Sequence, residues 1–86
     1  MVLFKKCICR ALRKIRLENK KTQEYVAEQL SKMIGKNIRQ AYVSKIENGN
    51  CSVSIKRLGY FCRVLGCPPH YVVSIAEKYY NRENQP

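Results

Sequence analysis

The residues that could bind a metal or catalyse a reaction are few and poorly spaced for either role. The chain has five cysteines, at positions 7, 9, 51, 62 and 67, and one histidine, His70. The cysteines lack the paired C-x-x-C spacing of zinc sites, and the Cys7 and Cys9 side chains would diverge on a helix. No glycine-rich phosphate loop or nucleophile motif is present. The sequence therefore predicts no metal, no cofactor and no enzymatic activity.

Positive charge is the dominant chemical property of the chain. It has 17 Lys and Arg against 6 Asp and Glu, a formal net charge of +11. Such a field attracts polyanions, so nucleic acid, an anionic membrane or an acidic protein is the expected class of partner. The alternative to a polyanionic partner is that the positive charge serves only to keep the protein soluble. No apolar stretch approaches the roughly 18 residues of a membrane span, so we expect a cytoplasmic protein with no membrane partner.

Apolar residues recur with helical spacing in five segments, which predicts a single all-α domain, a compact bundle of five short helices, over residues 1–86. The expected boundaries are residues 5–20 for the first helix, Thr22 to Gly35 for the second, 38–49 for the third, Ser54 to Gly66 for the fourth, and a start at Pro68 and Pro69 for the fifth. The buried face expected for the fourth helix is Ile55, Leu58, Phe61, Cys62 and Leu65.

Three motifs connect these helices to DNA recognition. They are "TQEYVAEQL" at 22–30, "VSKIENG" at 43–49 and "SIKRLGYFCRVLG" at 54–66. Together they closely resemble the Cro/phage-repressor-like helix-turn-helix family, also called XRE, over about residues 8–73, with 74–86 as a C-terminal helical extension. The resemblance implies a lambda-repressor-like fold whose third helix enters the major groove of duplex DNA.

Glu47 stands out because the chain has so few acids. In the family, the glutamate at this position pairs with an arginine on the first helix, and the matching residue here is Arg16. The resemblance therefore implies a structural salt bridge, bidentate through the guanidinium fork, that ties the third helix to the first.

The resemblance also assigns the DNA contacts. The third helix is expected to contact the base edges. In such contacts glutamine can hydrogen-bond adenine, arginine or lysine can hydrogen-bond guanine, and alanine can contact the thymine methyl group. The expected base-reading residues are Arg39, Gln40, Ala41, Ser44 and Lys45. The expected phosphate contacts, which set register without reading sequence, are Gln23, Lys36, Asn48, Asn50, Ser52, Lys56 and Arg57. The resemblance also implies that Gln23 supports the third helix. For these positions, an ordinary solvated polar or charged side chain is the alternative.

Three features depart from the family pattern, and one of them is Lys21, which stands where the family usually has an apolar residue before the cap of the second helix. Residues 31–36, "SKMIGK", are an insertion between the second and third helices. We expect it to lengthen the second helix by a turn before Gly35, which leaves the docking angle of the third helix open. Arg39 stands where the family favours Ser or Thr as the cap of the third helix, so that cap is expected to be weak.

The C-terminal segment carries an apolar, aromatic stripe suited to a homodimer contact, because tyrosine is enriched at interfaces. The stripe is Tyr71, Val72, Ile75, Tyr79 and Tyr80. Packing of the same residues on the first and fourth helices within one chain is the alternative.

The leading functional prediction is a sequence-specific transcriptional regulator of duplex DNA, a nucleoid-associated repressor that binds an inverted-repeat operator as a homodimer. An antitoxin-like module that neutralises a toxin-like partner protein is a second hypothesis. A non-specific nucleic-acid binder is a third, although the chain lacks an obvious aromatic platform for stacking single strands.

Overall fold

The computed structural model describes residues 3–84, so the outermost residues of the expected 1–86 domain and of its 74–86 extension lie outside the described part. Five helices follow one another along the chain. They are α1 (Phe4–Glu18), α2 (Gln23–Ile34), α3 (Gln40–Glu47), α4 (Ile55–Leu65) and α5 (Pro69–Glu83). Residues 3–84 contain no strand, and the all-α prediction is confirmed.

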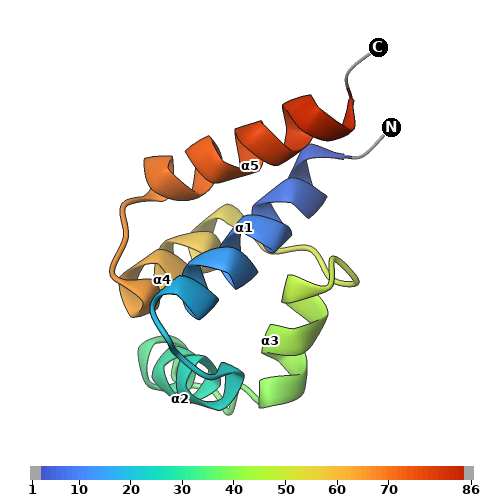
Figure 1. Cartoon of the computed structure of the whole chain (residues 1–86). Helices are drawn as coiled ribbons and strands as arrows, with labels where there is room; N and C mark the ends of the chain where they lie inside the picture. Colours follow the sequence, from blue (N-terminus) through green and yellow to red (C-terminus); the bar gives the residue numbers. More distant parts are fainter. Residues whose placement is uncertain (1–2, 85–86) are drawn as a thin grey trace.

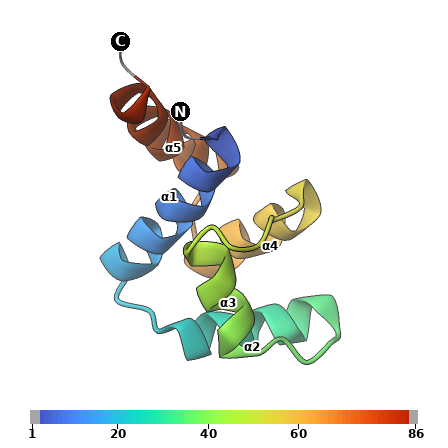
Figure 2. The same ribbon diagram turned by 90° about the vertical axis from the view of Figure 1, so that its right-hand side faces the viewer.

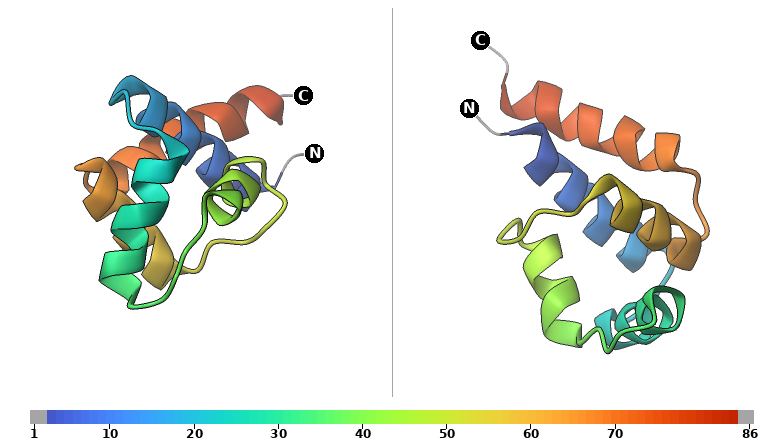
Figure 3. Two further views of the ribbon diagram at one scale, coloured as in Figure 1. Left: turned by 90° about the horizontal axis from the view of Figure 1, so that it is seen from below. Right: turned by 180° about the vertical axis from the view of Figure 1, so that it is seen from behind.

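The helices form an elongated body of 43 × 22 × 22 Å. Figure 1 shows α5 at one end of the molecule, α1 beside it, and α2 with the start of α3 at the other end. Seen from behind in Figure 3, α1 and α5 again run side by side, and α4 lies between them and the pair formed by α2 and α3. Helix α1 also contacts α3 and α4, so it connects the two ends of the body.

One cluster of buried apolar side chains joins all five helices. On α1 the spacing of Ile8, Ala11, Leu12 and Ile15 turns one face inward, as the periodicity predicted. Each large side chain buried in this way contributes roughly 1.5–3 kcal/mol to stability. The largest fully buried side chains are Phe61, Leu12, Ile15, Leu30, Ile46, Val26, Val43, Val72 and Cys7.

Local signals set the ends of α2 and α4. The Thr22 hydroxyl accepts a hydrogen bond from the Tyr25 N–H at 3.0 Å, and the Ser54 hydroxyl accepts one from the Arg57 N–H at 3.1 Å. Gly35 ends α2 at a φ of +79°, a conformation that side chains with a Cβ rarely adopt. Arg39 precedes α3 without a side-chain cap, as expected.

The insertion lengthens α2, as predicted, and its return segment is fastened to the helix. The Ser31 hydroxyl donates to the Ala27 carbonyl at 2.8 Å and accepts from the Ile38 N–H at 2.8 Å. Ile34 and Ile38 both pack against the core. The connection from α2 to α3 is therefore held at several points, which fixes where α3 begins.

Two expectations about buried and exposed faces are corrected. Ile55 was expected in the core but is 89% exposed. Helical side chains lean toward the helix N-terminus, so the first residue of α4 projects beyond the end of the helix. Conversely, Val72 and Ile75 of the expected dimer stripe are buried in the core of the single chain, which is the alternative stated for the stripe. The stripe is therefore reduced to Tyr71, Tyr79 and Tyr80.

Candidate nucleic-acid interface

A buried ion pair fixes α3 on α1. The Arg16 guanidinium donates from Nε to Glu47 Oε2 at 2.6 Å and from Nη2 to Glu47 Oε1 at 3.0 Å. Its third nitrogen, Nη1, donates to the Lys21 carbonyl at 2.8 Å. Both side chains are almost fully buried. The bidentate pair expected from the sequence is present, and it sets the position of the C-terminal end of α3.

The same carboxylate begins a chain of hydrogen bonds that leads to the surface. Gln23 donates from Nε2 to Glu47 Oε1 at 3.0 Å, and its Oε1 accepts from Gln40 Nε2 at 2.6 Å. Gln40 is exposed at the first position of α3. The side chain expected to read a base is thus connected through Gln23 and Glu47 to the buried Arg16.

Helix α3 has a core face and an open face. Val43, Ile46 and Glu47 are buried, whereas Gln40, Ala41 and Lys45 are exposed. Figure 2 shows α3 in front of the rest of the molecule, with α2 crossing behind its first turn. Arg39 is also exposed, and Ser44 is half-buried beside Asn48, whose amide donates to its hydroxyl at 3.4 Å. Four of the five expected base-reading residues therefore lie open to solvent.

Several of the expected phosphate-binding residues lie together beside this helix. Lys36, from the insertion, and Lys56 and Arg57, from the first turn of α4, line one surface hollow of about 320 Å³. The Arg57 guanidinium lies 5.2 Å from the centre of the Tyr42 ring, and its hydrogen bond to Tyr42 raises the Arg57 pKa. These three cations stand at the positive end of the α4 dipole, a position that favours an anion.

The other expected phosphate residues flank α3. Asn48, Asn50 and Ser52 are exposed in the turn that follows it, and Gln23 begins α2. Because Gln23 is half-buried and bonded to both Glu47 and Gln40, its visible role is to support α3.

The pair of helices α2 and α3, with an open polar face at the start of α3, is the geometry of a helix-turn-helix motif. A family model described as helix-turn-helix, HTH_3, matches residues 12–72. The chain belongs to the HTH_3 helix-turn-helix family. The XRE-type resemblance is therefore confirmed, and with it a DNA-binding domain of this kind.

One solved structure is similar to this protein over nearly the whole length of the chain. It is the crystal structure of the clp gene regulator ClgR from C. glutamicum, with a TM-score of 0.82 and 25% sequence identity. The similarity covers 92% of this chain and 95% of that one. No curated protein sequence matches the chain. The likeness extends to α5, beyond the segment matched by the family model.

Two contacts that hold side chains around α3 were not predicted from the sequence. The contact between the Tyr42 ring and Arg57 was not expected from the sequence. Gln23 was expected to support the third helix, but its hydrogen bond to Gln40 was not anticipated. Each contact joins residues far apart in the sequence, so only the angle between two helices reveals it.

Within residues 3–84, no group of three or more His, Cys, Asp or Glu side chains lies close enough to hold a metal ion. Burial raises the pKa of the Cys62 thiol to about 11, so it is protonated at neutral pH. In the same part of the chain, no helix is long and apolar enough to cross a membrane.

Proposed function

We propose that this protein is a sequence-specific transcriptional regulator that places α3 in the major groove of duplex DNA. The observation that carries the proposal is the exposed Gln40 held by Gln23 at 2.6 Å, at the end of hydrogen bonds that begin at the buried Arg16. Most surface glutamines are free to rotate. A glutamine oriented before DNA arrives loses less conformational entropy on binding.

When Gln40 is hydrogen-bonded to Gln23, it still has the donor and the acceptor that are needed to bind an adenine. Adenine offers an acceptor at N7 and a donor at N6 in the major groove. Gln40 uses one hydrogen of its amide nitrogen on Gln23. Its second hydrogen and its carbonyl oxygen remain for N7 and N6 of one adenine. We therefore expect an A·T pair opposite Gln40, a guanine opposite Lys45, and a thymine methyl near Ala41.

Contacts to the phosphate backbone of the DNA complete the proposed docking. The cations Lys36, Lys56 and Arg57 line one surface hollow, and Arg57 also lies over the Tyr42 ring of α3. Asn48, Asn50 and Ser52 lie in the turn at the other end of the helix. Phosphate contacts on both sides of the groove would hold α3 at a defined depth. In this arrangement the insertion extends the phosphate contact through Lys36.

A regulatory role is supported by the similar solved structure, which is that of a clp gene regulator. We infer that the protein binds an inverted repeat as a homodimer, since two-fold helix-turn-helix proteins read half-sites about 34–36 Å apart. A dimer bound over a promoter excludes other proteins from it, which favours repression. Tyr80, whose ring packs edge-on against the exposed Phe4 at 5.5 Å, is our candidate for the dimer contact.

The phosphate contacts predict a specific salt dependence. Each phosphate neutralised contributes about 0.9 to the slope of log affinity against log salt concentration. We expect Lys56→Ala and Arg57→Ala each to lower that slope by about this amount on any duplex, without changing the preferred sequence. Fluorescence anisotropy at a series of salt concentrations measures it.

Arg63→Ala is the matched control, because Arg63 is an exposed cation at the other end of α4. Its slope should equal that of the unmodified protein. If all three variants keep the same slope, α4 does not contact phosphate and the docking proposed here is wrong.

A further inference from the structure

Side chains of α1 and α5 line a basic groove. Figure 1 shows these two helices side by side, with the start of α3 at the other end of the molecule. Two adjoining hollows form this groove, of about 490 and 330 Å³, and both are lined by Lys14, Glu18 and Tyr79. We call it the α1–α5 groove. None of its residues belongs to the DNA-binding surface proposed above.

Cations outnumber acids along the groove. Its lining cations are Arg10, Arg13, Lys14, Lys78 and Arg82. Glu18 is the one acid in the lining, and it is engaged by Lys14 at 3.3 Å and by the Tyr71 hydroxyl at 3.5 Å. Within the described part of the chain, Arg13 and Lys78 form no ion pair. Two exposed cations are therefore available to an incoming anion.

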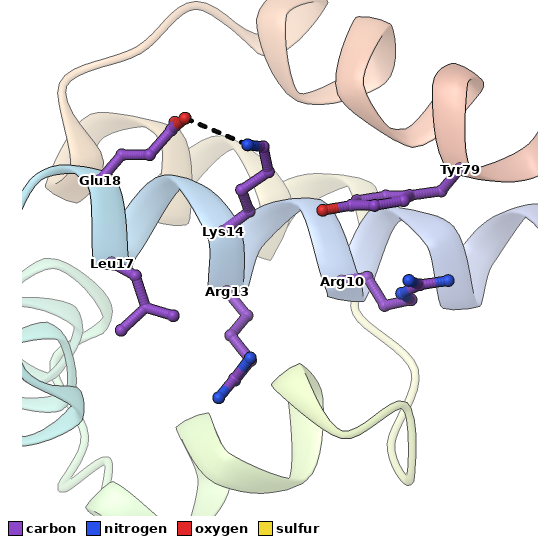
Figure 4. A pocket seen from close by; sticks show the side chains of 6 residues that line it. All are labelled: Arg10, Arg13, Lys14, Leu17, Glu18 and Tyr79. Atoms are coloured by element: carbon purple, nitrogen blue, oxygen red, sulfur yellow. Dashed lines mark ion pairs between the residues drawn. The ribbon is translucent and has the colours of Figure 1, made fainter.

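Aromatic and apolar groups accompany these charges. Arg10 lies 4.2 Å from the centre of the Tyr79 ring and Arg82 lies 6.0 Å from it. Figure 4 shows Tyr79 reaching from α5 toward α1 beside Arg10. In this view Lys14 and Glu18 project from the edge of α1 nearer α5, and Arg13 and Leu17 project from its opposite edge, and all four line the same hollow. Leu17 is 49% exposed. Tyrosine and arginine are the residue types enriched in the energetic centres of protein interfaces.

These features together favour one kind of occupant. A DNA backbone would be bound by the cations alone and would leave the Tyr71 and Tyr79 rings and Leu17 unused. A second copy of the chain would bring the same cations to the groove and repel them. An acidic peptide with an apolar side chain matches both the charge and the aromatic surface.

We propose that the α1–α5 groove docks an acidic segment of a partner protein. Carboxylates of that segment pair with Arg13 and Lys78, and an apolar side chain packs on Tyr79 and Leu17. Tyr71 and Tyr79 then belong to this groove and not to a homodimer contact. The docking is independent of DNA binding, because the two surfaces lie on different helices.

The test uses the full chain labelled with ¹⁵N and a synthetic peptide of repeating Glu-Glu-Leu units. We expect the peptide to shift amide signals of α1 and α5 around Arg13 and Lys78 and to leave those of α3 unchanged. Reversing both charges, Arg13→Glu with Lys78→Glu, should weaken peptide binding by about tenfold, since two exposed ion pairs become like-charge contacts. Binding of the variant to duplex DNA should retain its sequence preference.

The matched control is Lys20→Glu with Arg63→Glu, which changes the net charge equally at two exposed sites outside the groove. An equal loss of peptide affinity in this control would overturn the proposal, because the attraction would then be non-specific. So would peptide shifts confined to α3. Groove signals that respond to a random duplex and not to the peptide would assign the groove to DNA. A dimer that dissociates when Arg13 and Lys78 are reversed would assign it to self-association.

Discussion

Replacement of Glu47 by alanine should lower the free energy of unfolding by about 3 kcal/mol. The variant leaves the Arg16 guanidinium without its partner in a buried site, where an uncompensated charge is costly. It also removes the acceptor of Gln23. For a domain of this size, the melting temperature should fall by roughly 12–24 °C. Circular dichroism of helix content against temperature measures the change.

The matched control is Glu83→Ala, which breaks the exposed pair between Glu83 and Arg10 at 3.1 Å. An exposed pair contributes less than about 1 kcal/mol, so this variant should melt within a few degrees of the unmodified protein. Equal melting temperatures for the two variants would show that the buried pair does not hold α3 in place.

The second large effect is expected at Gln40. If Gln40 makes the bidentate adenine contact proposed above, Gln40→Ala should weaken binding to the preferred duplex by roughly 1–3 kcal/mol, about 5- to 150-fold. The loss should be confined to one A·T pair in each half-site, at which all four base pairs become nearly equivalent. Anisotropy titrations against duplexes substituted at each position measure both quantities.

Two further variants separate base reading from support. Gln23→Ala removes the bond that orients Gln40 and should weaken binding less than Gln40→Ala, with the adenine preference retained. Gln29→Ala is the matched control, because Gln29 lies on α2 outside the hydrogen bonds that join Glu47, Gln23 and Gln40, and it should bind normally. A base-preference profile unchanged in Gln40→Ala would remove Gln40 from the reading surface.

The sequence predicted most of the fold because local signals agree with the packing. Thr22, Gly35, Ser54 and Gly66 mark the ends of α2 and α4 in the structure as they do in the sequence. These signals act within one turn of the chain, so their effect depends little on tertiary structure. The pairing of Arg16 with Glu47 was also expected, but from family resemblance, since no local rule joins residues 31 positions apart.

The errors arose where the outcome depends on a neighbouring element. Val72 and Ile75 keep the spacing of an apolar face, which a dimer contact and a core share. Only the position of α5 along α1 shows that this face is buried within the chain. Ile55 keeps the same spacing as the core residues of α4 but begins the helix, where no segment covers it. Periodicity identifies an apolar face without showing what lies against it.

The groove between α1 and α5 was equally beyond sequence reasoning. Arg13 and Lys78 are 65 positions apart and each is typical of a solvated helix surface. Their common setting depends on the alignment of α1 with α5, which places Tyr79 over Arg10. Basic charge was evident from composition, but its division between a DNA-binding surface and a second groove was not.

The most direct test of the central claim is selection of bound duplexes from a random DNA library with the purified full chain at about 0.15 M salt, where non-specific binding is weak. We expect enrichment of an inverted repeat whose half-sites are about one helical turn apart, each with an A·T pair that Gln40→Ala no longer selects. Salt-sensitive binding with no enriched sequence would contradict it, because α3 would then contact DNA without reading bases.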